Sequence, residues 1–416
     1  MHLRRLSSVT LVSALLGLLA CETATPSTPD AALGADATHA DATHADTPHA
    51  DASGLDAPRA DDAFVPTTDA PGDDPPPPDA RVGVFVAQGY AGRVSVSCDD
   101  GRTWSFDRED ALADESGLPL PPVDRCFDGV DCDHHPGRAK GIVFHHGWFV
   151  RTNGWGPPGA VRRSRNGITW EKVLEGTTFG GIATSSDGAS EGFVLLGART
   201  PRRSADDAAS FVESENEAIP GWNVRRAGHA LGRFVIVGGN GTEVGVSADG
   251  VRWAAPTSID ARCGEGIQND GGIAEIGDAM VIVGGNGTVC RSTDGGVSWT
   301  AHALPDGATP SSSDVIRAGS ELFVWADGAL LRSSDGVAWT STPTEPRITV
   351  GAVARSPSGT FVAVRGGWGA WNEAQRFYRS PDGVRWEELS TDAARRAHPI
   401  GWIAWGEVDG TLACRE

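Results

Sequence analysis

Short apolar runs alternate with glycine-rich segments from residue 81 to the end of the chain. Seven of these runs are rich in Val, Ile and Phe and have the length of β-strands, and each is followed by a loop and a further strand-like run. This spacing predicts an all-β domain over residues 81–416 with about 48 residues to each repeat. The seven runs are 82–87, 147–150, 193–196, 234–237, 281–283, 323–325 and 361–364.

Six repeats contain nearly the same turn, which we call the Ser–Asp turn. Each begins with Ser, continues with Asp or Asn two residues later and then Gly, and ends on Trp. The polar side chains can hydrogen-bond the turn backbone, Gly supplies a positive φ, and Trp re-enters the core. The seventh repeat lacks such a turn, and we expect the segment 214–217 with Trp222 to be its degenerate remnant. The six turns are 97–104, 164–170, 247–253, 292–299, 333–339 and 380–386.

The Ser–Asp turns resemble the Asp-box, or bacterial neuraminidase repeat, of pattern Ser-x-Asp-x-Gly-x-Thr-Trp. Residues 97–104 match it in full, residues 292–299 carry Ser298 in place of Thr, and the other four turns are one residue shorter. In families with this repeat, the box joins the third and fourth strands of a β-propeller blade and serves folding. The resemblance therefore implies an all-β, seven-bladed β-propeller, with six blades as the alternative.

The first and last repeats are expected to meet and close a ring. The first repeat begins directly with its run at 82–87 and lacks an innermost strand, whereas the C-terminus holds a surplus apolar segment at 400–407. That segment could complete the first blade. A disulfide between Cys98 and Cys414 would then lock the seam by limiting the unfolded ensemble.

Disulfides are the expected state of the six cysteines that follow Cys21, because their number is even and the chain carries an export signal. Zinc is the alternative, but no Cys-x-x-Cys pair is present. Besides Cys98 and Cys414, the expected pairs are Cys126 with Cys132, within one loop, and Cys263 with Cys290, within one repeat.

Residues 1–21 have the pattern of a lipoprotein signal peptide. Arg4 and Arg5 precede an apolar run that is too short to remain as a membrane-spanning helix. The run ends Leu-Leu-Ala-Cys, which resembles a bacterial lipobox and implies lipidation of Cys21; the alternative is an ordinary signal peptide. We therefore expect an extracytoplasmic protein anchored by lipid to the cell envelope, at the outer membrane or cell surface.

Residues 22–80 are dominated by Ala, Asp, Thr and Pro, and we expect a disordered tether because such a segment has little apolar surface to bury. It holds 13 acidic residues and one arginine, so it contributes −12 of the formal net charge of −20. The rest of the chain is only mildly acidic and shows no basic stripe, which argues against nucleic acid as a partner. A monomer is expected.

The longest insertions between the predicted strands are the candidate binding loops. They are expected on the face opposite the Ser–Asp turns, in repeats one, two, three and seven, which adjoin one another in a closed ring. Tryptophans at loop tips offer flat faces to a sugar or an apolar partner, and arginines can bind carboxylate or phosphate. The alternative for both is packing or internal ion pairing. The candidate ligand-binding residues are Trp155, Arg199, Arg202, Trp368 and Trp371.

An acidic loop in the first insertion could bind calcium. Asp128, Asp131 and Asp133 lie within six residues and provide the oxygen ligands that Ca²⁺ prefers. The spacing is not that of an EF-hand, so a solvated acidic loop is the favoured interpretation, and no other cofactor is expected.

Two functions of different classes fit this sequence. A sialidase-like glycoside hydrolase would need a three-arginine clamp, a Tyr nucleophile paired with a Glu, and an acid Asp. Only Tyr90 and Tyr378 are present, neither has a Glu convincingly placed beside it, and the Phe/Tyr-Arg-Ile-Pro motif that sialidases carry at the first blade is missing. We therefore favour a ligand-binding or interaction module that takes a glycan, peptide or protein at the envelope, and assign no catalytic residues.

Overall fold

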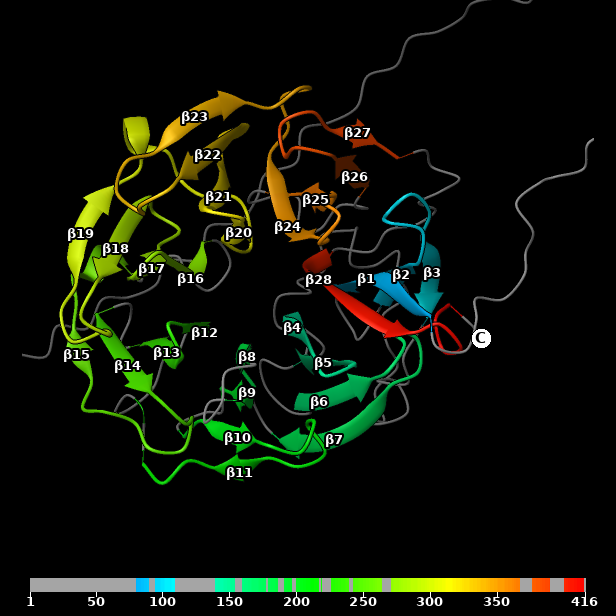
Figure 1. The fold of residues 1–416 in the computed structure, drawn as a ribbon, viewed down its shortest axis with the longest axis horizontal. Helices are drawn as coiled ribbons and strands as arrows, with labels where there is room; N and C mark the ends of the chain where they lie inside the picture. Colours follow the sequence, from blue (N-terminus) through cyan, green and yellow to red (C-terminus); the bar gives the residue numbers. More distant parts are fainter. Residues whose placement is uncertain are drawn as a thin grey trace, which may run out of the picture. The chain divides into compact units, whose positions relative to one another are not determined.

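The strands of this chain form a ring of seven sheets. The computed structural model describes residues 80–89, 94–108, 139–153, 159–176, 179–185, 191–196, 200–216, 218, 226–238, 242–263, 271–366, 376–389 and 400–414, without the side chains of 106–108 and 261. The described strands build seven four-stranded sheets around a common centre (Figure 1). The fold is thus a seven-bladed β-propeller, and the six-bladed alternative is wrong. No helix within the described ranges is long and apolar enough to cross a membrane.

Neighbouring strands within each blade are antiparallel. From the centre of the ring outwards, the strands of each blade are as follows. Blade 1 contains β28 (Ile400–Asp409), β1 (Arg81–Gly89), β2 (Val94–Ser97) and β3 (Ser105–Arg108). Blade 2 contains β4 (Ala139–His145), β5 (Trp148–Asn153), β6 (Gly159–Ser164) and β7 (Glu171–Gly176). Blade 3 contains β8 (Ile182–Ser185), β9 (Gly192–Leu195), β10 (Arg202–Ser204) and β11 (Val212–Glu213). Blade 4 contains β12 (Arg226–Ala230), β13 (Arg233–Gly238), β14 (Glu243–Ser247) and β15 (Thr257–Ser258).

The remaining blades follow the same order. Blade 5 contains β16 (Gly272–Ile276), β17 (Ala279–Val283), β18 (Thr288–Ser292) and β19 (Thr300–Ala303). Blade 6 contains β20 (Ile316–Ala318), β21 (Glu321–Ala326), β22 (Ala329–Ser333) and β23 (Thr340–Pro343). Blade 7 contains β24 (Val350–Arg355), β25 (Phe361–Arg365), β26 (Phe377–Ser380) and β27 (Glu387–Glu388). Within the described ranges, two short 3₁₀ turns, η6 (Ala261–Cys263) and η7 (Pro305–Gly307), lie in the connections after blades 4 and 5.

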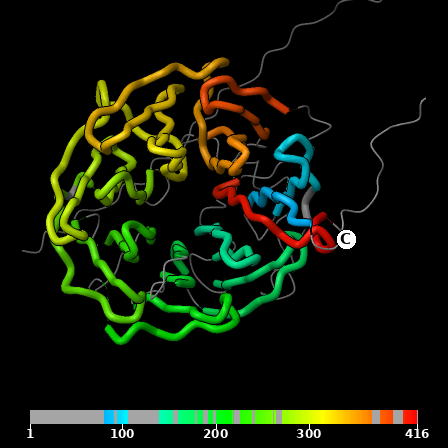
Figure 2. The backbone as a smooth tube through the Cα atoms, viewed as in Figure 1, coloured from blue at the N-terminus to red at the C-terminus, as the bar shows by residue number. Residues whose placement is uncertain are grey.

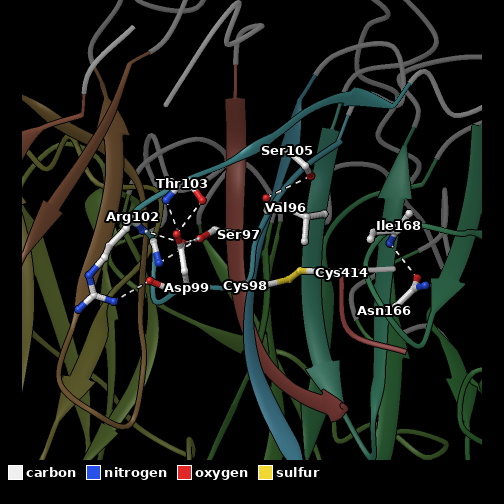
Figure 3. Close-up of a disulfide and its surroundings, with 11 residues drawn as sticks. Val96, Ser97, Cys98, Asp99, Arg102, Thr103, Ser105, Asn166, Ile168 and Cys414 are labelled. Carbon is white, nitrogen blue, oxygen red and sulfur yellow. Dashed lines mark hydrogen bonds between the residues drawn. A yellow bond between two sulfur atoms is a disulfide. The ribbon is translucent and has the colours of Figure 1, made fainter. Parts of the chain in front are cut away.

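The C-terminal strand closes the ring, as the surplus segment in the sequence predicts. β28 pairs with β1 from Arg81 opposite Asp409 to Gly89 opposite Ile400, and Figure 2 shows the red C-terminal segment running beside the blue first strand. Cys98 and Cys414 form a disulfide with their Cα atoms 6.2 Å apart, beside the hydrogen-bonded turn around Asp99 (Figure 3). The two ends of the domain are therefore joined by a strand ladder and a covalent bond.

A second disulfide lies within the core between blades 4 and 5. It joins Cys263 in η6 to Cys290 in β18, both fully buried, with Cα atoms 5.6 Å apart. This is the pairing that the sequence suggests for these two cysteines. Cys126 and Cys132 lie outside the described residues.

Each Ser–Asp turn is held by its own side chains. The Ser hydroxyl accepts a hydrogen bond from the turn Gly, as from Gly101 N to Ser97 Oγ at 3.0 Å, and the carboxylate accepts two further backbone N–H groups. In the long turns a hydroxyl also reaches the second carboxylate oxygen, as Thr103 does to Asp99 at 2.6 Å. The turn tryptophans are core residues to different degrees: three are buried (Trp104, Trp253 and Trp386) and three are half-buried (Trp170, Trp299 and Trp339).

The seventh turn is present, but not where the sequence analysis places it. It spans residues 204–211, with Ala208 in the glycine position and Phe211 in place of Trp. Ala208 N donates to Ser204 Oγ at 3.0 Å, and Ser210 Oγ donates to Asp206 at 2.6 Å, as in the other long turns. The expected remnant at residues 214–217 is therefore wrong. The sequence hides the true turn because Ala208, and not glycine, adopts its positive φ of 58°. Ser214 instead accepts a hydrogen bond at its Oγ from the indole Nε1 of Trp253, in the next blade, at 3.2 Å.

The Ser–Asp turns also connect neighbouring blades. The turn Gly lies against an apolar side chain of the preceding blade: a Cβ on Gly167 would be 2.5 Å from Val86, and one on Gly336 would be 2.7 Å from Val281. Buried clusters accordingly mix residues of adjacent blades, and Trp104 of blade 1 stacks on Phe377 of blade 7 at 3.7 Å. Four arginines donate to the backbone of the next blade's turn: Arg163 to Asp207, Arg203 to Asp249, Arg291 to Asp335 and Arg379 to Asp100.

Close approach of the innermost strands predicts a stability difference between two glycines. A Cβ on Gly228 would lie 2.6 Å from the Ile273 Cβ of the next blade, whereas a Cβ on Gly181 would meet Ala227 N at an ordinary 3.7 Å. We expect Gly228→Ala to lower the free energy of unfolding by ~1–3 kcal/mol through overpacking, and Gly181→Ala to change it far less. Denaturant unfolding of both variants measures this, and equal losses would contradict the packing described.

The turn carboxylates predict an acid-sensitive fold. Backbone N–H groups of Val337 and Ala338 lower the pKa of Asp335 below its ordinary value of 3.8. The ionised carboxylate therefore stabilises the fold above that ordinary value, and the stabilisation is lost as the pH falls through the lowered pKa.

In blade 2 the same position holds Asn166, whose amide oxygen accepts the same two backbone bonds and does not titrate in this range. We expect Asp335→Asn to leave the melting temperature at neutral pH nearly unchanged and to reduce its fall between about pH 5 and pH 2.5. Asn166→Asp should steepen that fall. Melting curves against pH test both, and identical pH profiles for the two variants and the parent would refute the prediction.

Candidate functional site

The innermost strands of the seven blades line a central cavity of about 460 Å³. All seven run in the same direction through the ring, so they begin at one face, which we call the loop face, and end at the face with the Ser–Asp turns, which we call the turn face. The cavity is lined by backbone and small apolar residues together with a few charged and aromatic side chains. These are Lys140, Arg226, His229, Glu275, Asp314, Arg317 and Trp402.

Arg226 crosses the cavity near the loop face. It is the first residue of β12 in blade 4, yet its guanidinium lies over the Trp402 ring of blade 1 at 4.3 Å. Its Nη2 donates to the Ser313 carbonyl and to Asp314 Oδ1 of blade 6, both at 2.9 Å. Neither blade 1 nor blade 6 adjoins blade 4. One buried side chain thus joins three separated blades and places an indole and a carboxylate side by side.

Asp314 is the polar group of this cluster that a ligand can reach. Its side chain lines the cavity and is 43% exposed, against 7% for Arg226. The surrounding protein nevertheless desolvates the carboxylate and raises the pKa of Asp314, while the Arg226 charge opposes that rise. The cluster therefore offers a carboxylate acceptor next to the half-buried face of Trp402.

A second polar link lies towards the turn face. Glu275 in β16 accepts a hydrogen bond from Leu231 N of blade 4 at 2.6 Å and pairs with Arg317 of blade 6. Blades 4, 5 and 6 are joined in this way by one carboxylate. His229 of β12 also lines the cavity and packs edge-on against Phe234. The cavity is thus polar along its length.

Most of the sequence-predicted site lies outside the described residues. This holds for Trp155, Arg199, Trp368, Trp371 and the proposed calcium ligands Asp128, Asp131 and Asp133, and also for Cys21. Each remains a prediction.

Arg202 is described, and its expected place in a binding loop is wrong. It begins β10, the third strand of blade 3, and Nη2 pairs with Glu213 of β11 at 3.0 Å. The predicted insertion at 197–209 contains this strand and the seventh Ser–Asp turn, whose missing Gly and Trp hid it. Arg203, beside it, faces the core and donates to Asp249 and Glu191 carbonyls. Neither arginine lines the central cavity.

Tyr378 does have a glutamate partner, contrary to the expectation from the sequence. Its hydroxyl donates to Glu388 Oε2 at 3.1 Å, and Arg376 pairs with the same carboxylate. However, β26 and β27 are the outer strands of blade 7, and Tyr378 is 8% exposed within the core. Burial and the Glu388 charge raise the pKa of Tyr378, which disfavours the phenolate that a nucleophile requires. The pair is a structural contact between strands.

The residues that meet at the loop-face end of the cavity were not predicted. Arg226, Asp314 and Trp402 are separated by 88 or more residues, and no spacing rule connects them. Their one shared feature is a position near the start of an innermost strand. That feature identifies them only after the closed ring is known.

Comparison with known proteins supports the fold. No protein-family model and no curated protein matches the chain. A protein from Lactobacillus plantarum aligns with a TM-score of 0.50 at 10% identity, over 79% of this chain and 100% of its own. YCF48 bound to a D1 peptide aligns at 0.46 with 16% identity over 68% and 87%. An inactive virginiamycin B lyase from Staphylococcus aureus, with quinupristin, aligns at 0.48 with 15% identity over 65% and 92%.

Proposed function

We propose that this propeller is a binding module that takes an extended segment of a partner protein at the loop-face mouth of its central cavity. The observation that carries the proposal is the convergence of Arg226, Asp314 and Trp402 from blades 4, 6 and 1. A binding site built on rigid strands from separate blades keeps its geometry without a ligand, which reduces the entropic cost of binding.

The chemistry of the mouth suits a polypeptide. Innermost strands leave one edge without a strand partner, so their backbone groups face the cavity and can hydrogen-bond an extended chain. Asp314 can accept an amide or ammonium donor, and the Trp402 ring can cover an apolar side chain. A glycan would use the same indole face, and the test below distinguishes the two ligands.

The alternative, a sialidase-like hydrolase, has less support. The tyrosine and glutamate that sit together, Tyr378 and Glu388, lie on outer strands away from the cavity. The described cavity lining offers two arginines, and each is already paired with a carboxylate. A carboxylate clamp for a sialoside would need arginines that are free to turn towards the substrate.

We also propose that the module works outside the cytoplasm, tethered to the cell envelope through a lipid on Cys21. The support is the lipobox-like end of the apolar leader and the tether-like composition of residues 22–80. Such a tether would let the propeller reach partners at a distance from the membrane.

Binding tests should separate the cavity from the rest of the surface. We expect the purified protein to bind members of an immobilised peptide array, with Asp314→Asn and Trp402→Ala each weakening binding at least tenfold. Asp278→Asn, on the turn face and 86% exposed, is the matched control and should bind like the parent. Melting temperatures verify that each variant is folded.

Three outcomes would count against a peptide-binding module. They are binding to a glycan array alone, binding that all three variants retain, and hydrolysis of a fluorogenic sialoside.

The anchor has a separate test in the native host. We expect the parent to fractionate with membranes and Cys21→Ser to lose the acyl mass and the membrane association, because a short leader alone does not hold a processed protein in a bilayer. Mass spectrometry of the mature N-terminus measures this directly. A non-acylated N-terminus on the parent would overturn the anchor and leave the binding proposal intact.

A further inference from the structure

A cluster of metal-binding side chains lies on the turn face, where blades 2 and 3 meet. His145 ends β4, His146 follows it in the hairpin turn, and Glu191 directly precedes β9 of the next blade. One ligand atom of each residue lies within 4.8 Å of the others. Two imidazoles and a carboxylate are a donor set that Zn²⁺ accepts, leaving a further position for water. We infer that these three residues form a zinc site that joins blades 2 and 3.

The buried ring of His145 is a second feature that points to a metal ion. Its side chain is only 7% exposed, and its Nε2 is buried without a hydrogen-bond partner. A buried polar atom left unsatisfied costs free energy, and a bound metal ion would satisfy this one. The ring is fixed by edge-on packing on Phe193.

Both ring nitrogens of His146 lie close to carboxylates. Its Nε2 lies 2.9 Å from Glu191 Oε1, on the side of the cluster, while its Nδ1 lies 3.4 Å from Asp207 Oδ1. An imidazole that donates one N–H to a carboxylate has its tautomer fixed and its other nitrogen made more basic. Asp207 would thus orient His146, with no direct bond to the ion required.

The charges and distances of the cluster allow the ion. The carboxylates of Glu191 and Asp207 balance a dication, and the guanidinium of the nearby Arg203 is turned to the Glu191 and Asp249 carbonyls. Tetrahedral zinc ligands lie about 3.3–3.5 Å apart. Donor atoms at the 4.8 Å limit would have to approach by about 1.4 Å, whereas His146 Nε2 and Glu191 Oε1, now 2.9 Å apart, would have to separate slightly. His146 and Glu191 are about half exposed and can make this movement. The His146 ring, which stacks on His145 with centroids 3.8 Å apart, would tilt as it does so.

Zinc titration of the full-length protein after chelator treatment tests the site. We expect His146→Ala and Glu191→Gln each to remove one bound equivalent measured by competition with a chromophoric chelator, and Asp207→Asn to weaken that equivalent by 10–100-fold. In the parent, zinc should also raise the melting temperature. Both removed side chains are exposed, so the variants should fold.

Two control variants test whether other histidines of the chain bind the zinc. His302→Ala removes a histidine elsewhere on the surface, and a triple variant of His39, His44 and His49 removes those of the N-terminal segment; both should keep the equivalent. Cobalt substitution gives a second readout, a visible d–d spectrum that His146→Ala abolishes. Failure of the parent to bind zinc, or stoichiometry and affinity unchanged in His146→Ala and Glu191→Gln, would overturn the proposal. Either result is independent of peptide binding at the cavity.

Discussion

The packing of each Ser–Asp turn against the preceding blade is the constraint on which the rest of this structure depends. In six turns a glycine brings its backbone onto an apolar side chain of the neighbouring sheet, at a distance where a Cβ would clash. In the seventh, the buried Ala208 takes the same place. Arginines in front of four turns then bond the backbone of the next turn. Because Arg379 makes this contact from blade 7 to blade 1, the seam is built like the other interfaces and is reinforced by β28 and by the disulfide of Cys98.

The sequence predicts this architecture well because its repeat is chemical as well as periodic. Ser, Asp and Gly at fixed offsets are needed for one turn conformation, so the turns could be located and counted from side-chain chemistry alone. The seventh escaped because Ala208 tolerates a positive φ within a fully buried site, and Phe211 takes the place of the tryptophan. At this turn, tertiary packing stabilises a conformation that the local sequence does not indicate. Because this turn was missed, strand β10 was interpreted as part of a loop, and Arg202 was wrongly expected in a binding loop.

The candidate sites could not be found in the same way, because they consist of residues that the ring brings together. Arg226 reaches blades 1 and 6 only when seven innermost strands surround one cavity, and His145 meets Glu191 only across the interface of blades 2 and 3. Sequence spacing carries no information about contacts across a ring. The fold thus supplies rigid positions around a closed interior, and a few polar residues at those positions supply the chemistry.

Ring closure is the central claim, and amide hydrogen exchange of residues 400–409 tests it most directly. These amides belong to an innermost strand paired with β1 along its whole length. They are predicted to exchange as slowly as those of residues 272–276, the innermost strand of blade 5, because both open only with the ring. Exchange of residues 400–409 at the rate of an unstructured chain, with residues 272–276 still protected, would contradict a propeller closed by its C-terminal strand.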